Sequence, residues 1–274
     1  VTLKGDHFGI TSGKRPDVFF NGLAAQVVSA TDTELKVTVP LGALSGTVRV
    51  AVSGLESVTK PFRVLSSLSL FPDYRQDAFD PTAQAPTSDV IALGATRSYR
   101  VRAFDTEGAL VPSPAVSWST LGNMGTGFSN GTLTPVIPGH MAIAAVSGSL
   151  STPPLAIEVV SRVIDVLGLP TRIAPLSPFN PNADASKRST VPDSIQLSPL
   201  VQLDGSMGVR NLPFLFKVEA NAPLAVSASG LVKVLENAPD GNYKVEVIPV
   251  ADPAQRRELT IPVLQQGDVS FIIR

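Results

Sequence analysis

Few residues of this chain stand in a pattern that could do chemistry. The run Gly127-Phe128-Ser129-Asn130-Gly131 matches G-x-S-x-G, the pattern that presents a nucleophilic serine in one class of hydrolases. That serine works only on a turn from a strand into a helix, whereas here Asn-Gly follows, a hairpin signal, and then another strand-like run. We therefore expect a hairpin turn and no catalytic serine.

The run from Gly9 to Lys14 has a weak likeness to a phosphate-binding loop. The spacing between its glycines is one residue short, and Arg15 stands where a Ser or Thr would hold magnesium. No helical pattern follows to offer its N-terminal amides. We expect a turn between strands and no nucleotide cofactor.

Ligands for a metal ion are scarce. The chain has no Cys and two His, and His7 and His140 lie far apart in the sequence. Four carboxylates stand loosely together without the spacing of a calcium loop: Asp73, Asp77, Asp80 and Asp89. We expect solvated loop residues and no metal site, with calcium at a junction between domains as the open alternative.

A set of aromatic residues gives a better candidate for binding. Tyr74 lies in a loop-like stretch with Phe71 and Phe79 nearby, and together they could form an exposed patch for a partner or a glycan. The favoured interpretation is nevertheless that the three pack against the first segment, with the exposed patch as the alternative. Tyr99 and Tyr243, in contrast, stand at inward-facing positions of alternating runs.

The composition excludes several classes of protein. The chain has 274 residues, 43% of them hydrophobic, with 22 Lys and Arg against 23 Asp and Glu. This balance argues against disorder and against nucleic-acid binding. No apolar run reaches the roughly 18–20 residues that span a bilayer, and the opening Val1–Lys4 has the pattern of a mature strand and not of a signal peptide.

Apolar and polar residues alternate in many short runs, which predicts strands with one buried face. Such runs include 35–39, 48–52, 99–103, 155–159 and 243–247. The best helical candidate, Pro253–Leu259, allows one or two turns at most. We therefore predict an all-β fold of tandem Ig-like β-sandwiches in an extended array.

Local signals refine this prediction. The dipeptides Asn21-Gly22, Asn130-Gly131 and Asp240-Gly241 predict tight turns, and Gly5 and Gly22 are expected to have positive φ. Trp118, the single Trp, stands in an alternating run and is expected to fill the space between two sheets.

Self-similarity divides the chain into three segments, 1–65, 66–161 and 162–274, the last with a loop rich in Pro, Asn and Ser at 170–193. Segment 1 resembles an IPT/TIG Ig-like domain through Val1–Gly9, Asp17–Gly22, Ala30–Leu35 and Gly46–Val50. Such domains usually open with one more strand before Val1, which this sequence does not show. The favoured interpretation is that this sequence is a fragment whose first strand was cut off. The alternative is an unpaired edge that accepts a strand from another copy or from an upstream segment.

Segment 2 resembles the bacterial group 2 Ig-like domains of the invasin and intimin type. The residues that carry this resemblance are Val101–Gly108, Val116–Ser119, Asn130–Leu133 and Ile143–Gly148. Segment 3 resembles the same group more loosely, best over 216–218, 229–234 and 238–245.

These resemblances imply a non-enzymatic structural or adhesive region of a bacterial surface or extracellular appendage protein, acting as a stalk, spacer or assembly subunit. They imply partners among other protein subunits or cell-surface components. The alternative is a carbohydrate-binding or accessory region of a secreted polysaccharide-active enzyme.

Overall fold

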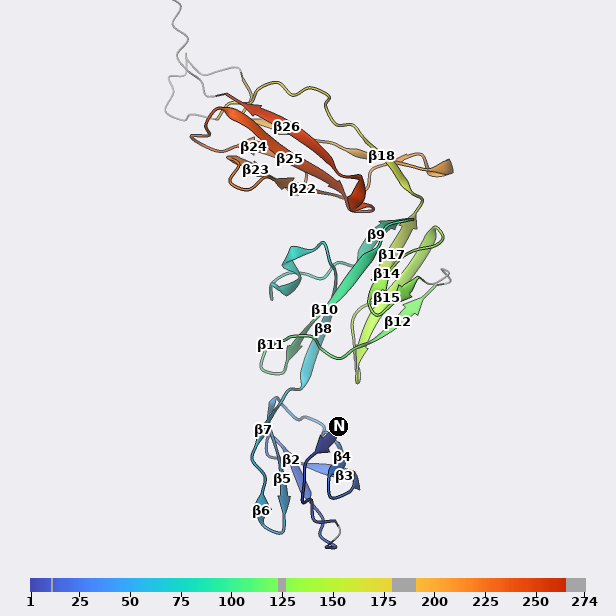
Figure 1. Ribbon diagram of the computed structural model, residues 1–274, viewed down its shortest axis with the longest axis vertical. Coiled ribbons are helices and arrows are strands. Elements are labelled where there is room, and N and C mark those ends of the chain that lie inside the picture. Colours follow the sequence, from blue (N-terminus) through green and yellow to red (C-terminus); the bar gives the residue numbers. More distant parts are fainter. Residues whose placement is uncertain (11, 123–126, 179–190, 265–274) are drawn as a thin grey trace, which may run out of the picture. The chain divides into compact units, whose positions relative to one another are not determined.

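The computed structural model describes residues 1–10, 12–122, 127–178 and 191–264. Within these ranges the regular elements are β-strands and short 3-10 turns, without an α-helix, so the predicted all-β, Ig-like sandwich class is confirmed (Figure 1). No helix in the described ranges is long and apolar enough to cross a membrane.

The chain divides into two compact units. Unit 1 comprises 1–86, 99–119 and 144–154, and unit 2 comprises 87–98, 120–143 and 155–274. Strands β10, β12 and β15 have residues in both units. The predicted segment boundaries at 65 and 161 stay a prediction.

Unit 1 begins with a seven-stranded sheet in the order β1-β4-β3-β2-β5-β6, in which β7 also pairs with β5. Its strands are β1 (Thr2–Lys4), β2 (Asp17–Phe20), β3 (Leu23–Ala30), β4 (Glu34–Thr38), β5 (Gly46–Val52), β6 (Leu55–Glu56) and β7 (Lys60–Phe62). β3 pairs first with β2 and then with β4, with a register shift between Val27 and Ser29. A bulge of this kind bends a strand, so that β3 joins the two groups of strands around one core.

Period-two alternation explains the core of this sheet. Val18 and Phe20 on β2, with Leu35 and Val37 on β4, are buried, while the residues between them face outward or are half-buried. The rings of Phe20 and Phe62 meet edge to face, with 4.5 Å between their centroids. Burial of these apolar side chains is the main source of stability here.

The turns of this sheet partly follow the predictions. Asn21 and Gly22, with φ of 46° and 85°, connect β2 to β3 in a two-residue hairpin. The prediction for Gly5 is wrong, because the positive φ of this turn falls on His7, at 62°. Glycine suits this position for another reason: a Cβ at Gly5 would lie 2.9 Å from Cζ of the Phe8 ring, so the ring would have to shift.

The rest of unit 1 is built around β10 (Arg97–Asp105), whose residues 99–105 pair antiparallel with β8 (Leu65–Pro72). The other elements are η1 (Gln76–Phe79), β11 (Leu110–Val111), β12 (Ser117–Leu121) and β16 (Leu150–Ser151). Trp118, which was expected to fill the space between two sheets, is half-buried on β12, the outermost strand of its sheet.

Unit 2 begins with β9 (Ser88–Ala92), which runs parallel to β17 (Leu155–Val160) over five residue pairs. On its other side β17 pairs antiparallel with β15 (Gly139–Ser147). A short hairpin of β13 (Phe128–Ser129) and β14 (Thr132–Leu133) pairs with the start of β10. Ile143, Leu155 and Ile157 are buried on the inner face.

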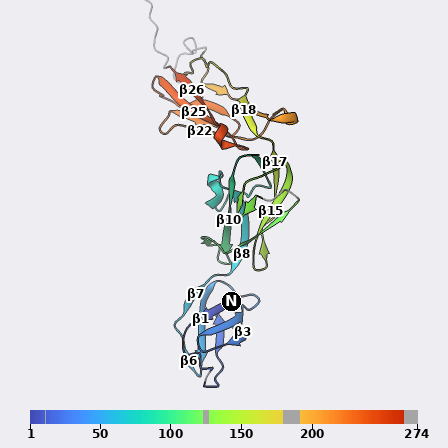
Figure 2. The ribbon, with the colours of Figure 1, turned by 45° about the vertical axis from the view of Figure 1, so that its right-hand side comes forward.

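Among the described residues, the remainder of unit 2 forms three three-stranded sheets, β18-β20-β21, β19-β24-β23 and β22-β25-β26. Their strands are β18 (Val163–Leu167), β19 (Ser194–Gln196), β20 (Leu200–Leu203), β21 (Val209–Arg210), β22 (Phe214–Val218), β23 (Leu224–Val226), β24 (Leu231–Val234), β25 (Gly241–Pro249) and β26 (Arg257–Val263), with 3-10 turns η3 (Gly205–Met207) and η4 (Pro253–Gln255). Figure 2 labels the three strands of the last of these sheets.

Three details here differ from the sequence predictions. The candidate helix at 253–259 is one 3-10 turn followed directly by β26. Asp240-Gly241 is not a hairpin turn but a bend that leads into β25. The predicted loop 170–193 is partly built into the core, because Leu176 is buried and forms a bridge to Val263. Residues 179–190 of that loop lie outside the described residues.

Candidate functional site

The serine motif forms a hairpin, as predicted. Ser129 on β13 is paired with Thr132 on β14, and the turn residues Asn130 and Gly131 have φ of 48° and 79°. The motif therefore passes from strand to strand, without the helix whose amides would stabilise an oxyanion. Ser129 is exposed.

The run from Gly9 to Lys14 is a turn between β1 and β2, which confirms that prediction. Its backbone amides are occupied within the turn: Ser12 donates to the carbonyl of Gly9 at 3.2 Å, and Gly13 donates to that of Ile10 at 2.9 Å. The amide of Ile10 donates to Oδ1 of Asp32 at 2.7 Å. These amides do not converge on an open anion site, as a phosphate loop would require. Thr11 lies outside the described residues.

The carboxylates considered for calcium have separate partners. Asp77 forms an ion pair with Arg75, and this hydrogen bond holds the pKa of the Asp77 carboxyl below its ordinary value. Asp80 accepts hydrogen bonds from the hydroxyl and amide of Thr82, which lower its pKa likewise. Asp89 is buried and forms an ion pair with Arg97.

The histidines do not add to these carboxylates. His7 is exposed on the turn after β1, as expected of a surface residue, and His140 is exposed on β15. Among the described residues, no three His, Asp or Glu side chains gather where one metal ion could be held.

The three aromatic candidates do not form one exposed patch. Phe71 is fully buried, Tyr74 is half-buried, and Phe79 is 53% exposed. The guanidinium of Arg102 lies 4.6 Å from the ring centroid of Phe71 and covers it. Phe79 lies on the short turn η1, and the guanidinium of Arg100 is 5.9 Å from its ring centroid. Binding at Tyr74 and Phe79 stays a prediction.

Arg102 also holds the loop that carries these aromatics. Its two terminal nitrogens donate to the carbonyls of Asp80 and Ala83, the second at 2.8 Å. The side chain is 6% exposed, and its Nε is buried without a hydrogen-bond partner. The loop 73–87 is thus attached to β10 by one guanidinium.

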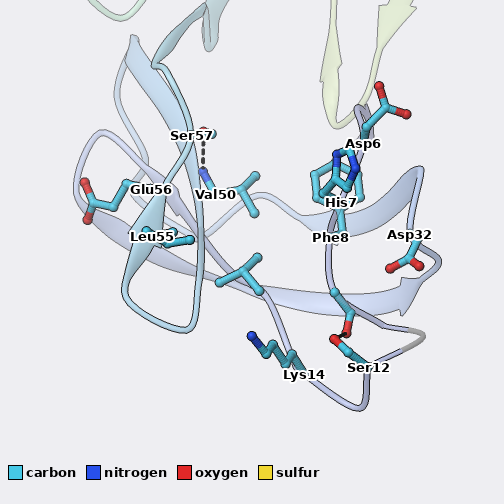
Figure 3. A pocket seen from close by; sticks show the side chains of 12 residues that line it. Asp6, His7, Phe8, Ser12, Lys14, Asp32, Val50, Leu55, Glu56 and Ser57 are labelled. Atoms are coloured by element: carbon cyan, nitrogen blue, oxygen red, sulfur yellow. Dashed lines mark hydrogen bonds between the residues drawn. The ribbon is translucent and has the colours of Figure 1, made fainter.

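The clearest hollow of unit 1 lies between the turn after β1 and the β5–β6 hairpin, with a volume of about 490 Å³ (Figure 3). Its floor includes Phe8, Val50 and Val52, and Lys14 extends from the turn toward the hairpin. Charged residues of both signs line its rim: Asp6, Lys14, Asp32 and Glu56.

This pocket offers no reacting pair of side chains. Ser12 and His7 both line it, but the hydroxyl of Ser12 donates to the carbonyl of Gly9 at 2.9 Å and so stays within its own turn. The apolar floor and mixed rim suit contact with a side chain of another molecule better than nucleophilic chemistry.

A second hollow, of about 330 Å³, lies in unit 2 and is mainly apolar. Phe214 and Phe216 on β22 line it together with Leu197 and Leu212. Gly230 is essential beside it, because its φ is 86° and a Cβ there would lie 2.7 Å from the carbonyl oxygen of Leu197. No charged side chain lines this hollow.

Arg97 and Asp89 form a buried ion pair in unit 2, and their side chains are 2% and 0% exposed. Nη1 of Arg97 lies 2.7 Å from Oδ1 of Asp89, and Nη2 donates to the carbonyl of Val250. Sequence reasoning missed this pair. One signal was available, because Arg97 shares the inward register of Tyr99, two residues further along β10.

In unit 1 a smaller polar network joins residues far apart in sequence. The amide of Ser45 donates to Oγ1 of Thr106 at 2.8 Å, and the amide of Thr106 donates to the carbonyl of Val64 at 3.0 Å. Beside it, Asp105 accepts bonds from the amides of Glu107 and Ala109. Burial alone would raise the pKa of Asp105, but these bonds outweigh it and lower that pKa.

Comparison with known proteins gives only distant likenesses. No family model matches the sequence, and no curated protein matches it. Among solved structures, the chain is similar to the S-layer protein SbsC (12% identity, 94% of this chain and 36% of that chain, TM-score 0.27). It is also similar to the Escherichia coli adhesin FdeC (12%, 96% and 87%, 0.28) and to the Yersinia pseudotuberculosis adhesin InvE (14%, 73% and 60%, 0.27).

The chain thus spans about a third of the length of that S-layer structure. Likenesses this distant say nothing about activity or partners. The fold class follows from the strand pairings themselves.

Proposed function

We propose that this chain is a non-enzymatic structural or adhesive region of tandem Ig-like domains in a bacterial cell-surface or extracellular appendage protein. In this proposal the first segment is of the IPT/TIG type and the following ones are of the group 2 Ig-like type. The region acts as a spacer or an assembly subunit, and its partners are other protein subunits or cell-surface components.

The observation that carries the proposal is the bonding across the predicted segment boundaries. Residues on either side of the boundary at 65 share a partly buried hydrogen bond, from the amide of Ser45 to Oγ1 of Thr106. A buried hydrogen bond crosses the boundary at 161, from Arg97 to the carbonyl of Val250. A spacer is better made of consecutive domains that contact each other in this way than of domains that are connected only by linkers.

The structures of the two runs that resemble catalytic and phosphate-binding motifs support the same proposal. The serine motif forms a hairpin and the glycine-rich run forms a turn, and the backbone groups of both take part in hydrogen bonds within these structures. The carbohydrate-binding alternative loses its best support, because Phe71 is buried and leaves only Tyr74 and Phe79 to present aromatic surface.

The test uses the full chain on a glycan array and on beads coated to equal density. A spacer or adhesive subunit is expected to show no selective binding to polysaccharides, while the coated beads bind each other or a bacterial or host surface. Tight binding to one polysaccharide that is lost on Tyr74→Ala, with Tyr243→Phe as the matched control, would overturn the proposal in favour of an accessory module.

A further inference from the structure

One guanidinium in unit 2 gathers three oxygen atoms from two distant stretches of chain. Arg97 lies 2.7 Å from Oδ1 of Asp89 and 3.3 Å from the carbonyl oxygen of Val90, both on β9. Its other terminal nitrogen donates to the carbonyl of Val250, directly after β25. A carboxylate and two carbonyls around one charge form the kind of oxygen set that a bound cation collects.

The surroundings of this group exclude water. Next to it the amide of Ala92, at the end of β9, donates to the carbonyl of Ala251 at 2.8 Å. Ala92 and Ala251 have no exposed surface, and Val250 is 2% exposed. A charged hydrogen bond in such a place is stronger than one at the surface, and an unpaired charge there is correspondingly costly.

We propose that Arg97 is an internal cation that bonds the β25–β26 turn to β9, so that the β9–β17 sheet and the β22-β25-β26 sheet unfold as one cooperative unit. The planar guanidinium suits this role because it has several donors in fixed directions. A lysine, with a single ammonium head, would not reach the carboxylate and the distant carbonyl together. The inference concerns folding and stands apart from the proposed surface function.

The test reports on the two sheets separately within the full chain. Because the chain has no Cys, one introduced cysteine takes a fluorescent label at a single site. His140→Cys, exposed on β15, reports on the β9–β17 sheet, and Thr260→Cys, exposed on β26, reports on the other sheet. With Arg97 intact, the two labels are expected to show coincident thermal and urea unfolding midpoints.

Arg97→Met is expected to separate the two midpoints and to lower that of the His140→Cys label by about 10 °C, because it removes the buried cation that pairs with the carboxylate of Asp89. The matched control is Arg210→Met, which removes the half-exposed ion pair between Arg210 and Glu158 in the same unit. That variant is expected to shift both midpoints together, by about 2 °C or less.

A second variant approaches the contact from its other side. Ala251→Leu overfills the buried space at the turn while it leaves the Arg97–Asp89 pair in place, and it is expected to separate the midpoints as well. The proposal is overturned if the midpoints already differ with Arg97 intact, or if both variants keep them coincident.

Discussion

The attachment of the loop 73–87 by Arg102 leads to a quantitative prediction for Arg102→Met. Methionine keeps an apolar side chain at this position but removes the guanidinium over Phe71 and, with it, both donors to the loop carbonyls of Asp80 and Ala83. Hydrogen bonds from a charged donor contribute about 1.5–3 kcal/mol each. The buried Nε, which has no partner, offsets about 1–3 kcal/mol of that gain. We expect the free energy of unfolding to fall by about 2–3 kcal/mol.

Two assays measure this change. Urea unfolding followed by the fluorescence of Trp118, the single Trp of the chain, gives the free energy. Limited trypsin digestion measures the loop directly, since Arg75 lies within it, and cleavage there is expected to become several-fold faster.

The matched control is Arg100→Met on the same strand. Arg100 is exposed, and its contact with Phe79 is a distant one, so we expect a loss of about 0.5 kcal/mol or less and unchanged cleavage at Arg75. The reasoning is refuted if Arg102→Met unfolds within about 0.5 kcal/mol of this control and is digested at the same rate.

Three further predictions concern single residues. Because the pKa of Asp105 is lowered, the contribution of its carboxylate to stability is complete above about pH 5 and is lost as the pH falls through that pKa. Asp105→Asn should therefore lower Tm at pH 7 and make the decline of Tm in acid less steep. Because Asn130 has a φ of 48°, Asn130→Ala should cost about 1 kcal/mol in urea unfolding, and Asn130→Gly much less. Phe20→Ala should cost about 3–5 kcal/mol, against no measurable loss for the fully exposed Leu41→Ala; equal losses would contradict the described core.

The fold class was predictable because alternation and turn chemistry act locally. The runs that contain Leu35 and Val37, or Leu155 and Ile157, alternate as a half-buried strand must, and Asn-Gly dictates its own hairpin. Gly5 shows the limit of this reasoning. Its lack of a Cβ serves the nearby ring of Phe8, a contact that no pattern in the turn itself displays.

The candidate sites were less predictable, because they depend on which strands become neighbours. Phe71 was chosen for its position near a loop, yet pairing of β8 with β10 places it beneath Arg102. Trp118 has the alternation of a buried strand but lies on an outermost one. The bond from Arg97 to Val250 joins residues more than one hundred and fifty positions apart, beyond the reach of any local signal.

The parallel pairing of β9 with β17 has a mechanical consequence. Tension applied along the chain would draw the start of β9 and the end of β17 in opposite directions along the strand axis. In a parallel pair these two ends lie at opposite ends of the ladder, so the five residue pairs resist sliding together and do not open one after another. The sheet that contains β9 and β17 therefore resists tension along the chain at this strand pairing.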